Sequence, residues 1–387
     1  MVTVLILFIY LSFISLGLES PLLGAVWPAA HAELGAATSA AGIISTMTTA
    51  GTIVSSLLSA RIISKLGPGR TAASAVLLTA TGLMLFSVSK SWIGFALIAV
   101  PLGLGGGLID TSINNYVATH YHYRQVNFLH AFWGLGATLG PIILSADIAA
   151  GSWRAGYRTI SFIQYAVAVL LFLSLPLWKR VAKAEGVEPV RQELSYRVVL
   201  KKPGFALAVA TFLCYCAAES ITSLWASTYL VETQGMSEAL AARAGSLYFF
   251  GMLIGRILCG LFSSRLDTRR MIRIGVGAAI IGILPILLNL SEPLQLVGLA
   301  CAGAGCGPIY PAFVKLTPER FGVECSQSAI GLEMAGDYVG AMCLPPLFGA
   351  VANATTFRIY PYVLIVMLLG AALLQIPLDK RTGRAAA

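Results

Sequence analysis

The chain has 387 residues, of which 57% are hydrophobic and only 11% are charged, and its mean hydropathy is +0.81. A soluble globular protein carries about 25% charged residues, so this composition excludes a soluble domain. The formal net charge of +9 does not indicate nucleic-acid binding, because the basic residues gather in short segments between apolar ones, as they do beside a membrane.

Apolar stretches of about 20 residues follow one another along the chain, and each is long enough to cross a bilayer as a helix. Lipid offers the backbone no hydrogen-bond partners, so only helices or a closed barrel can span it, and these runs lack the alternation of barrel strands. We therefore predict an all-α polytopic membrane protein with twelve transmembrane helices. The predicted spans are 3–30, 38–60, 71–89, 92–119, 125–149, 157–178, 204–231, 240–263, 272–290, 294–316, 326–350 and 357–378.

One long polar segment, 179–203, separates six predicted spans from six. It predicts an N-terminal six-helix bundle over 1–178, a linker over 179–203 and a C-terminal six-helix bundle over 204–387. Lysine and arginine gather in this linker and in the loops on the same side, Arg320 among them. The positive-inside rule therefore predicts a multi-pass protein of the cell (inner) membrane with the linker and both termini in the cytoplasm.

The sequence repeats itself at an offset of 200 residues. Glu19 returns as Glu219, and the glycines of the fourth span return in the tenth. The returning pairs include Gly103 and Gly303, Gly105 and Gly305, Gly107 and Gly307, Gly136 and Gly336, and Gly140 and Gly340. Many secondary transporters are built from a duplicated apolar chain, with the solute site where the repeats meet.

Ionisable residues inside the predicted spans are few. Each costs about 3 kcal/mol on insertion scales, so each needs a physical reason. Spans 3, 6, 9 and 12 carry none in their interiors; we expect these spans to face lipid and the others to line a wet cavity. The ionisable residues of the other spans are Glu19, Asp110, His130, Glu219, Arg256, Lys315, Glu333 and Asp337.

The buried acids are candidates for ion coupling. A carboxyl group in a low-dielectric site holds its proton more readily than one in water, which suits a proton-coupled carrier. We predict proton-coupling or gating roles for Glu219, Glu19, Arg256, Glu333 and Asp337. Among them Glu219 is favoured, and Arg256 is expected to neutralise Asp110 or Glu333. The alternative for each acid is a structural hydrogen bond or ion pair.

Polar and aromatic residues of the cavity-lining spans are candidates for solute binding. Asn114 follows Asp110 by one helical turn, so the two share a helix face. His130 is either a donor or proton relay, or a satisfied polar group. The predicted substrate-binding residues are Asp110, Asn114, His130, Trp133, Trp225, Tyr229 and Tyr310.

The seven cysteines all lie in the second half, and their number is odd. We expect buried thiols that pack as small apolar residues. Their spacing suits no metal site, and the glycine-rich stretch at 103–107 lacks the Lys-Ser/Thr of a phosphate loop. We therefore predict a protein that is not an enzyme, with no catalytic residues, no metal and no cofactor.

The predicted organisation resembles the major facilitator superfamily over essentially the whole chain. The resemblance rests on twelve spans in two halves, a basic central linker and basic loops after spans 2 and 8. The loop signature of that family is present in part, at Ala60–Arg70 and from Gly260 to Arg265. Ser64 stands where the family has an aspartate, and the second copy lacks the aspartate as well.

Within the superfamily the chain is similar to the fucose/galactose/glucose–proton symporter branch, which includes the glucose permease-like proteins. The motifs are Glu219-x5-Trp225-x3-Tyr229, Gly251-x3-Gly255-Arg256-x3-Gly260 and Asn127-x2-His130-x-Phe132-Trp133. The resemblance implies that Asp110 matches the span 4 acid that binds sugar in fucose permeases. Trp133 stands where those proteins use an asparagine, and their span 1 acid lies deeper in the helix than Glu19.

Together these features predict a proton-coupled secondary transporter that acts as a monomer in the lipid bilayer. It would symport a sugar or similar small polar solute by alternating access, with sodium as the alternative coupling ion. A proton-driven antiporter that exports drugs or metabolites is a second interpretation, which Gly136-x3-Gly140-Pro141 supports through its resemblance to an antiporter signature. A transport-inactive membrane receptor is a third.

Overall fold

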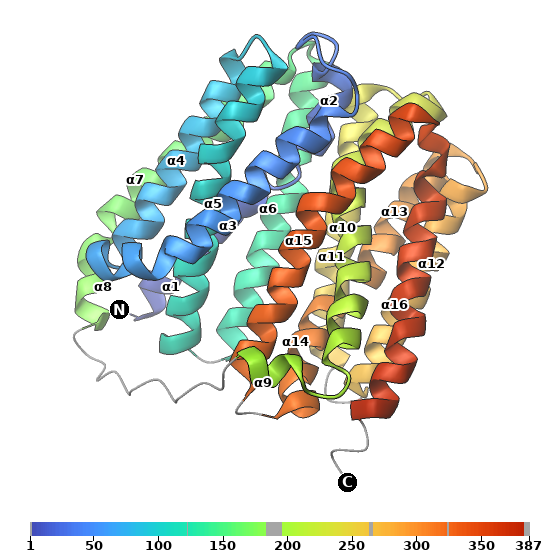
Figure 1. Ribbon diagram of the computed structural model, residues 1–387. Helices are drawn as coiled ribbons and strands as arrows, with labels where there is room; N and C mark the ends of the chain where they lie inside the picture. Colours follow the sequence, from blue (N-terminus) through green and yellow to red (C-terminus); the bar gives the residue numbers. More distant parts are fainter. Residues whose placement is uncertain (1, 122, 183–195, 263–265, 323–324, 383–387) are drawn as a thin grey trace. The chain divides into compact units, whose positions relative to one another are not determined.

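The computed structural model describes the chain apart from residues 1, 122, 183–195, 263–265, 323–324 and 383–387. All regular secondary structure in the described residues is helical (Figure 1). The helices before the central polar segment are α1 (Val2–Glu19), α2 (Leu22–Ala30), α3 (Ala40–Leu66), α4 (Pro68–Val88), α5 (Trp92–His120), α6 (Tyr123–Ala149), α7 (Trp153–Leu173) and α8 (Leu175–Ala182). Those that follow are α9 (Tyr196–Leu200), α10 (Phe205–Gln234), α11 (Glu238–Phe262), α12 (Thr268–Leu287), α13 (Glu292–Cys306), α14 (Ile309–Phe321), α15 (Ser326–Ala354), the 3-10 helix η2 (Phe357–Ile359) and α16 (Tyr360–Thr382).

Eleven helical segments of the described chain are long and apolar enough to cross a membrane. They coincide with eleven of the twelve predicted spans, which confirms the all-α polytopic fold. The remaining predicted span, 326–350, corresponds to α15, a helix of 29 residues. It is not among the eleven because Glu333, Asp337 and two prolines lower its hydropathy.

Two of the predicted spans are each interrupted at a proline. Span 3–30 is interrupted at Ser20 and Pro21 between α1 and α2, and span 294–316 is interrupted at Gly307 and Pro308 between α13 and α14. Proline lacks the backbone N–H and crowds the preceding turn, which accounts for both interruptions. The equivalent positions of the other repeat are not proline, and there α10 and α5 run through without a break.

The offset of 200 residues is preserved in the helix packing. In the first half Gly103 of α5 lies against the backbone of Thr48 in α3, and in the second half Gly303 of α13 lies against the backbone of Tyr248 in α11. A Cβ atom at either glycine would overlap the facing carbonyl oxygen. Both residue numbers of the contact therefore shift by 200, so the repeat in sequence is also a repeat in structure.

The contact between α4 and α5 also recurs at an offset of 200 residues, as the contact between α12 and α13. A Cβ at Gly105 would lie 2.9 Å from the Ala75 carbonyl oxygen, and a Cβ at Gly305 would lie 2.5 Å from the carbonyl oxygen of Gly275 in α12. Glycine is the residue that lets helix backbones approach this closely in a membrane protein. This assigns the glycine-rich stretches to helix packing.

The pair α1–α6 and its equivalent α10–α15 differ in their packing. Gly136 and Gly140 of α6 lie against the α1 backbone, and Gly17 of α1 lies against the α6 backbone. In the second half a Cβ at Gly336 would meet only the side chain of Val209, at 2.9 Å. Ala217 stands where α1 has Gly17, and its methyl group forbids the closer approach.

The described residues fall into two compact units. The first comprises Met1–Glu188, Leu224–Ser246 and Gly349–Ala354, and the second comprises Pro189–Ser223, Leu247–Phe348 and Thr355–Ala387. These units are not the predicted six-helix halves, which stay a prediction. Most of the predicted linker, 183–195, lies outside the described residues, and its C-terminal part contains the short helix α9.

Candidate solute and ion-coupling residues

Glu19 lies at the end of α1, where its carboxylate faces α5 and α7. The side-chain amide of Gln164 on α7 donates a long hydrogen bond of 3.4 Å to Glu19 Oε2 and a bond of 2.8 Å to the Ser15 carbonyl oxygen. Thr79 of α4 donates to Gln164 Oε1 at 2.9 Å. A Cβ at Gly106 of α5 would lie 3.1 Å from Glu19 Oε1. The hydrogen bond that Glu19 accepts from another helix therefore comes from a neutral amide.

Glu219 has its own neutral donor. The hydroxyl of Tyr215, one turn earlier on α10, donates to Glu219 Oε2 and lies 3.2 Å from the carbonyl oxygen of Cys306 in α13. Cys306 is the repeat equivalent of Gly106. The two repeat-related acids therefore approach equivalent positions of α5 and α13, one directly and the other through a tyrosine.

Asp337 of α15 belongs to the same polar cluster as Glu219. Its carboxylate accepts a hydrogen bond from the thiol of Cys216 on α10 and interacts electrostatically with Glu219. The thiol of Cys306 forms a hydrogen bond with Tyr248 of α11. Cys216 and Cys306 are thus hydrogen-bonding groups, which corrects the expectation that the buried thiols act only as apolar residues.

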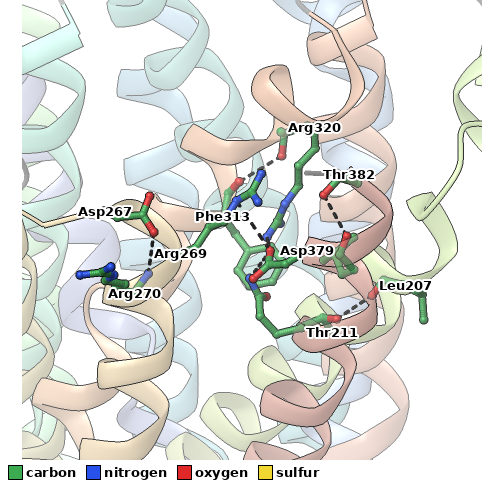
Figure 2. A network of polar contacts seen from close by, with 12 residues as sticks. Leu207, Thr211, Asp267, Arg269, Arg270, Phe313, Arg320, Asp379 and Thr382 are labelled. Carbon is green, nitrogen blue, oxygen red and sulfur yellow. Dashed lines mark hydrogen bonds and ion pairs between the residues drawn. The ribbon is translucent and has the colours of Figure 1, made fainter. Parts of the chain in front are cut away.

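A charged network that the sequence analysis missed lies at the end of α14 (Figure 2). The Arg320 side chain is fully buried, and its Nη2 donates to Asp379 Oδ1 of α16 at 3.2 Å. Arg269 of α12 approaches the same oxygen at 3.8 Å, and Gln375 donates to it at 3.1 Å. The prediction that Arg320 is a loop residue is therefore wrong, because Arg320 lies in the last turn of α14. Its guanidinium carbon is 5.1 Å from the centre of the Phe313 ring.

Glu333 of α15 is joined to this network. It is 3% exposed and accepts a hydrogen bond of 2.8 Å from Thr317 of α14. Its carboxylate also interacts electrostatically with Arg320. The structure places Glu333 beside Arg320, which the positive-inside argument assigns to a loop. The coupling role of Glu333 and its pairing with Arg256 stay predictions. A basic residue within the limits of an apolar helix was the available signal.

Asp110 and Asn114 do share one face of α5. Asn114 Nδ2 donates to Asp110 Oδ1 at 2.8 Å, and both side chains are partly buried. The amide therefore holds the carboxylate in place and leaves its own carbonyl oxygen as an acceptor. Such a pair presents both donor and acceptor groups to a hydroxyl-rich or amide-bearing solute.

The two predicted residues of α6 lie near α1. His130 is partly buried, with its ring edge-on to Phe13 at 5.9 Å between centroids. Trp133 is partly buried, and its carbonyl oxygen lies against Gly17. Both residues therefore lie on the side of α6 that packs with α1, close to the helix that carries Glu19.

The predicted aromatic residues of the second half differ in burial. Trp225 is fully buried on α10, and a Cβ at Gly349 of α15 would overlap its indole ring. Tyr229 is buried, and its hydroxyl accepts a hydrogen bond from Gln234 at 3.0 Å. Tyr310 is partly buried and packs 5.4 Å from the ring of Phe212. Trp225 is therefore closed off from solvent in this structure, whereas Tyr310 keeps an accessible surface.

Tyr215 and Cys216 of α10 belong to the polar cluster but were not among the predicted site residues. Tyr215 lies four residues before Glu219, a spacing at which helix side chains meet, so the donor was visible in the sequence. Cys216 was not predictable as a partner, because its contact with Asp337 joins α10 to α15. No group of three His, Cys, Asp or Glu side chains suited to a metal ion occurs among the residues that the structure describes.

Comparisons with known proteins give a family match. The family model described as Major Facilitator Superfamily matches residues 5–291 and 207–386. The glucose/mannose transporter GlcP of Bacillus subtilis is 23% identical over 265 residues, which cover 67% of this chain and 66% of GlcP. The cis,cis-muconate transport protein of Acinetobacter baylyi is 24% identical over 363 residues, which cover 90% of this chain and 87% of that protein.

The fold also matches a solved structure. The crystal structure of a bacterial homologue of the human lysosomal transporter Spinster, in an inward-facing and unoccupied conformation, superposes with a TM-score of 0.75. The match covers 99% of this chain and 98% of that one at 12% sequence identity. At this identity the likeness establishes the fold and carries no information on the solute.

Proposed function

Since the chain belongs to the Major Facilitator Superfamily, and is thus a membrane transporter of small solutes, we propose that it is a proton-coupled symporter of a sugar or similar small polar solute. The observation that carries this proposal is the repeat-related pair of acids, Glu19 and Glu219. Each is partly buried within a membrane-spanning helix, and their hydrogen-bond donors in the structure are an amide and a phenol. A carboxyl group among neutral donors can gain and lose a proton without breaking an ion pair.

The solute is proposed from the polar groups of α5. Asp110 and Asn114 together offer the acceptors and donors that match neighbouring hydroxyls. The glucose/mannose transporter GlcP is a relative, which supports a hexose as the first solute to test. Trp133 of α6 would add aromatic surface against the apolar face of a sugar ring.

An organic acid is the second candidate solute. The relative that spans the larger part of this chain is named a cis,cis-muconate transport protein. A carboxylate solute needs a cationic partner, and Arg256 on α11 is an arginine within a membrane-spanning helix that could supply it. The two candidates therefore predict different essential residues, Asp110 for a sugar and Arg256 for an acid.

Transport by purified protein in proteoliposomes tests the function. An inwardly directed proton gradient should drive accumulation of glucose or mannose, and a sodium gradient should not. We expect Glu219→Gln to abolish this accumulation and to leave exchange of solute across the membrane intact, because only the coupled step needs the titrating carboxyl. Accumulation by the variant with the pH dependence of the parent protein would make Glu219 structural.

The alternatives give other outcomes in the same vesicles. An antiporter would expel the solute when protons enter, and a receptor would bind solute without moving it. Muconate uptake in place of sugar uptake would select the organic-acid candidate. Each result rejects the sugar–proton symporter for a distinct reason.

We also propose that the 179–203 linker and both termini are cytoplasmic and that the six-helix halves 1–178 and 204–387 move as bodies. The basic residues of the linker support this orientation. Cysteines introduced into the linker of a variant without native cysteines should resist a membrane-impermeant thiol reagent in intact cells. Efficient labelling from outside would contradict the proposed topology and place the linker on the outer side.

A further inference from the structure

We propose that α12 and α16 together bind an anionic phospholipid, whose phosphate lies between Arg270 of α12 and Lys380 of α16. This binding surface is separate from the transport of solute, and it does not depend on which solute or ion the protein moves. Both helices belong to the second compact unit, so the surface is a property of that unit alone.

The two helices pack against each other in opposite directions. Arg269, in the first turn of α12, approaches Asp379, close to the end of α16, at 3.8 Å (Figure 2). The start of α12 therefore lies beside the end of α16. Since the two helices also pack together over part of their length, they are antiparallel.

This contact fixes the side to which the next residue of each helix projects. Each residue lies about 100° further around a helix than the one before it. Because α12 and α16 run in opposite directions, one step beyond Arg269 and one step beyond Asp379 turn towards the same side of the pair. Arg270 and Lys380 are these next residues, and both are exposed. Their charges therefore lie at the same depth on one common face.

Exposed aliphatic side chains continue this face along both helices. Ile274 and Ile281 follow Arg270 at helical spacing, and each is more than half exposed. Ile376 and Leu373 precede Lys380 at the same spacing, and each is again more than half exposed. We call this surface the α12–α16 outer face; it consists of Arg270, Arg273, Ile274, Ile281, Leu369, Leu373, Ile376 and Lys380. Exposed apolar surface of this kind marks a contact with membrane lipid.

The basic end of the outer face keeps a positive charge. In the part of the chain that the structure describes, the exposed side chains of Arg270, Arg273 and Lys380 form no ion pair. The nearby carboxylate of Asp379 pairs at 3.2 Å with a buried arginine of α14. Asp267 accepts a hydrogen bond of 3.2 Å from the Arg270 backbone N–H, and its single charge offsets only one of the three. An anion at this end therefore gains charge complementarity.

The order of basic and apolar groups matches a phospholipid better than a free anion. A phosphate ion would meet only the basic end, whereas a phospholipid carries an anionic group and acyl chains in the order in which the outer face presents their partners. Basic residues between membrane helices at the membrane surface bind anionic head groups. A zwitterionic lipid offers the same acyl chains without net charge, so the outer face should distinguish the two classes by head-group charge.

Native mass spectrometry of the delipidated full-length protein tests the proposal. The Kd of the first bound lipid is measured for phosphatidylglycerol and for phosphatidylethanolamine with the same acyl chains. We expect phosphatidylglycerol to bind the parent protein at least about tenfold more tightly. Arg270→Gln and Lys380→Gln should each weaken its binding about fivefold, since one basic residue near an anionic lipid contributes about 1 kcal/mol. Lys380→Arg keeps the charge and should bind like the parent protein.

The matched control is Arg381→Gln, the loss of the same charge one residue further along α16. Arg381 is exposed, but its Cβ lies 3.6 Å from a Cβ built at Gly204, on the side of α16 that faces the start of α10. It is therefore outside the outer face, and its variant should bind phosphatidylglycerol like the parent protein. Equal losses in Arg381→Gln and Lys380→Gln would overturn the proposal, because they would show only a general attraction between anionic lipid and basic residues.

Two other results would also overturn it. Equal Kd values for the two lipids would mean that the outer face contacts acyl chains without regard to head-group charge. Displacement of phosphatidylglycerol by excess inorganic phosphate, or by its deacylated head group glycerophosphoglycerol, would assign the basic residues to a soluble anion. Neither result bears on solute transport, so the lipid site and the proposed function stand or fall separately.

Discussion

The carboxylate of Glu33 accepts a hydrogen bond of 2.6 Å from the indole nitrogen of Trp153. Its other oxygen pairs with Arg154 Nη2 at 2.9 Å, and Arg154 also donates to the carbonyl oxygen of Ser87 at 3.3 Å. Glu33 follows α2, Ser87 lies at the end of α4 and Trp153 begins α7. One carboxylate thus ties together three helix ends on one side of the N-terminal half.

This contact predicts a pH-dependent contribution to stability. The hydrogen bond from Trp153, together with Arg154, lowers the pKa of Glu33. Stability is therefore complete above the ordinary pKa of a glutamate and is lost as the pH falls through the lowered value. Glu33→Gln should lower the melting temperature at neutral pH. The loss of unfolding free energy should be less than about 1 kcal/mol, because the carboxylate is half-exposed.

The measurement is thermal unfolding by intrinsic fluorescence in detergent at about pH 7 and about pH 3, on either side of the ordinary pKa of a glutamate. The difference between Glu33→Gln and the parent protein should shrink at the lower pH, where both carry a neutral side chain. Glu232→Gln, on an exposed residue at the end of α10, is the control. A difference that is independent of pH would contradict the prediction.

Backbone contacts at the repeated glycines predict a second effect. Gly103→Ala forces a methyl group into the carbonyl of Thr48, and Gly303→Ala does the same at Tyr248. Each should cost about 1–3 kcal/mol of unfolding free energy, since neither facing backbone can move cheaply. Chemical or thermal unfolding measures this. Gly277→Ala on α12, where a Cβ meets open space, should be neutral or slightly stabilising through helix propensity.

Asp110 should contribute directly to solute binding. Asp110→Asn keeps the size and shape of the side chain beside Asn114. It removes the negative charge of the carboxylate that accepts a hydrogen bond from the Asn114 amide. We expect affinity to fall by at least about 1 kcal/mol, the scale of one charge-assisted hydrogen bond. Calorimetric titration with the transported solute measures it. Thr111→Val, whose hydroxyl already bonds the Gly107 carbonyl, should bind normally, and equal affinity in both variants would remove Asp110 from the site.

The buried ion pair at the end of α14 predicts a large loss of stability. Asp379→Asn removes the carboxylate that pairs directly with the fully buried Arg320 and should cost about 3–5 kcal/mol. Arg269→Gln removes the longer, quarter-exposed pair and should cost at most about 1 kcal/mol. Denaturant or thermal unfolding of the two variants side by side is the measurement. Similar losses of unfolding free energy in the two variants would mean that the ion pairs of Asp379 with Arg320 and with Arg269 contribute equally to stability.

Much of the fold was predictable because lipid imposes a simple requirement on the backbone. Each of twelve apolar stretches had to form a helix, and α3, α5 and α11 begin or end within a few residues of the expected limits. The breaks at Pro21 and Pro308 follow from proline chemistry at known positions. The repeat was equally visible, since Gly103, Gly105 and their equivalents Gly303 and Gly305 put helix backbones in contact.

Pairing between helices was not predictable, because it depends on rotation and depth that apolar periodicity leaves open. Arg320 was assigned to a loop by its position and charge, and only the packing of α14 against α16 brings it to Asp379. Glu333 likewise meets Thr317 and Arg320, which both come from α14.

From the sequence alone one knows that this protein is a duplicated membrane-spanning helical chain with an acid at the same place in each repeat, because composition and spacing decide insertion in lipid. Which groups surround those acids was decided by tertiary structure. Gln164 of α7 donates a hydrogen bond to Glu19. Tyr215 donates a hydrogen bond to Glu219, and Asp337 interacts with Glu219 electrostatically. The physical reason is that a carboxyl group responds to whatever lies within a few ångströms, and those neighbours come from helices distant in the chain.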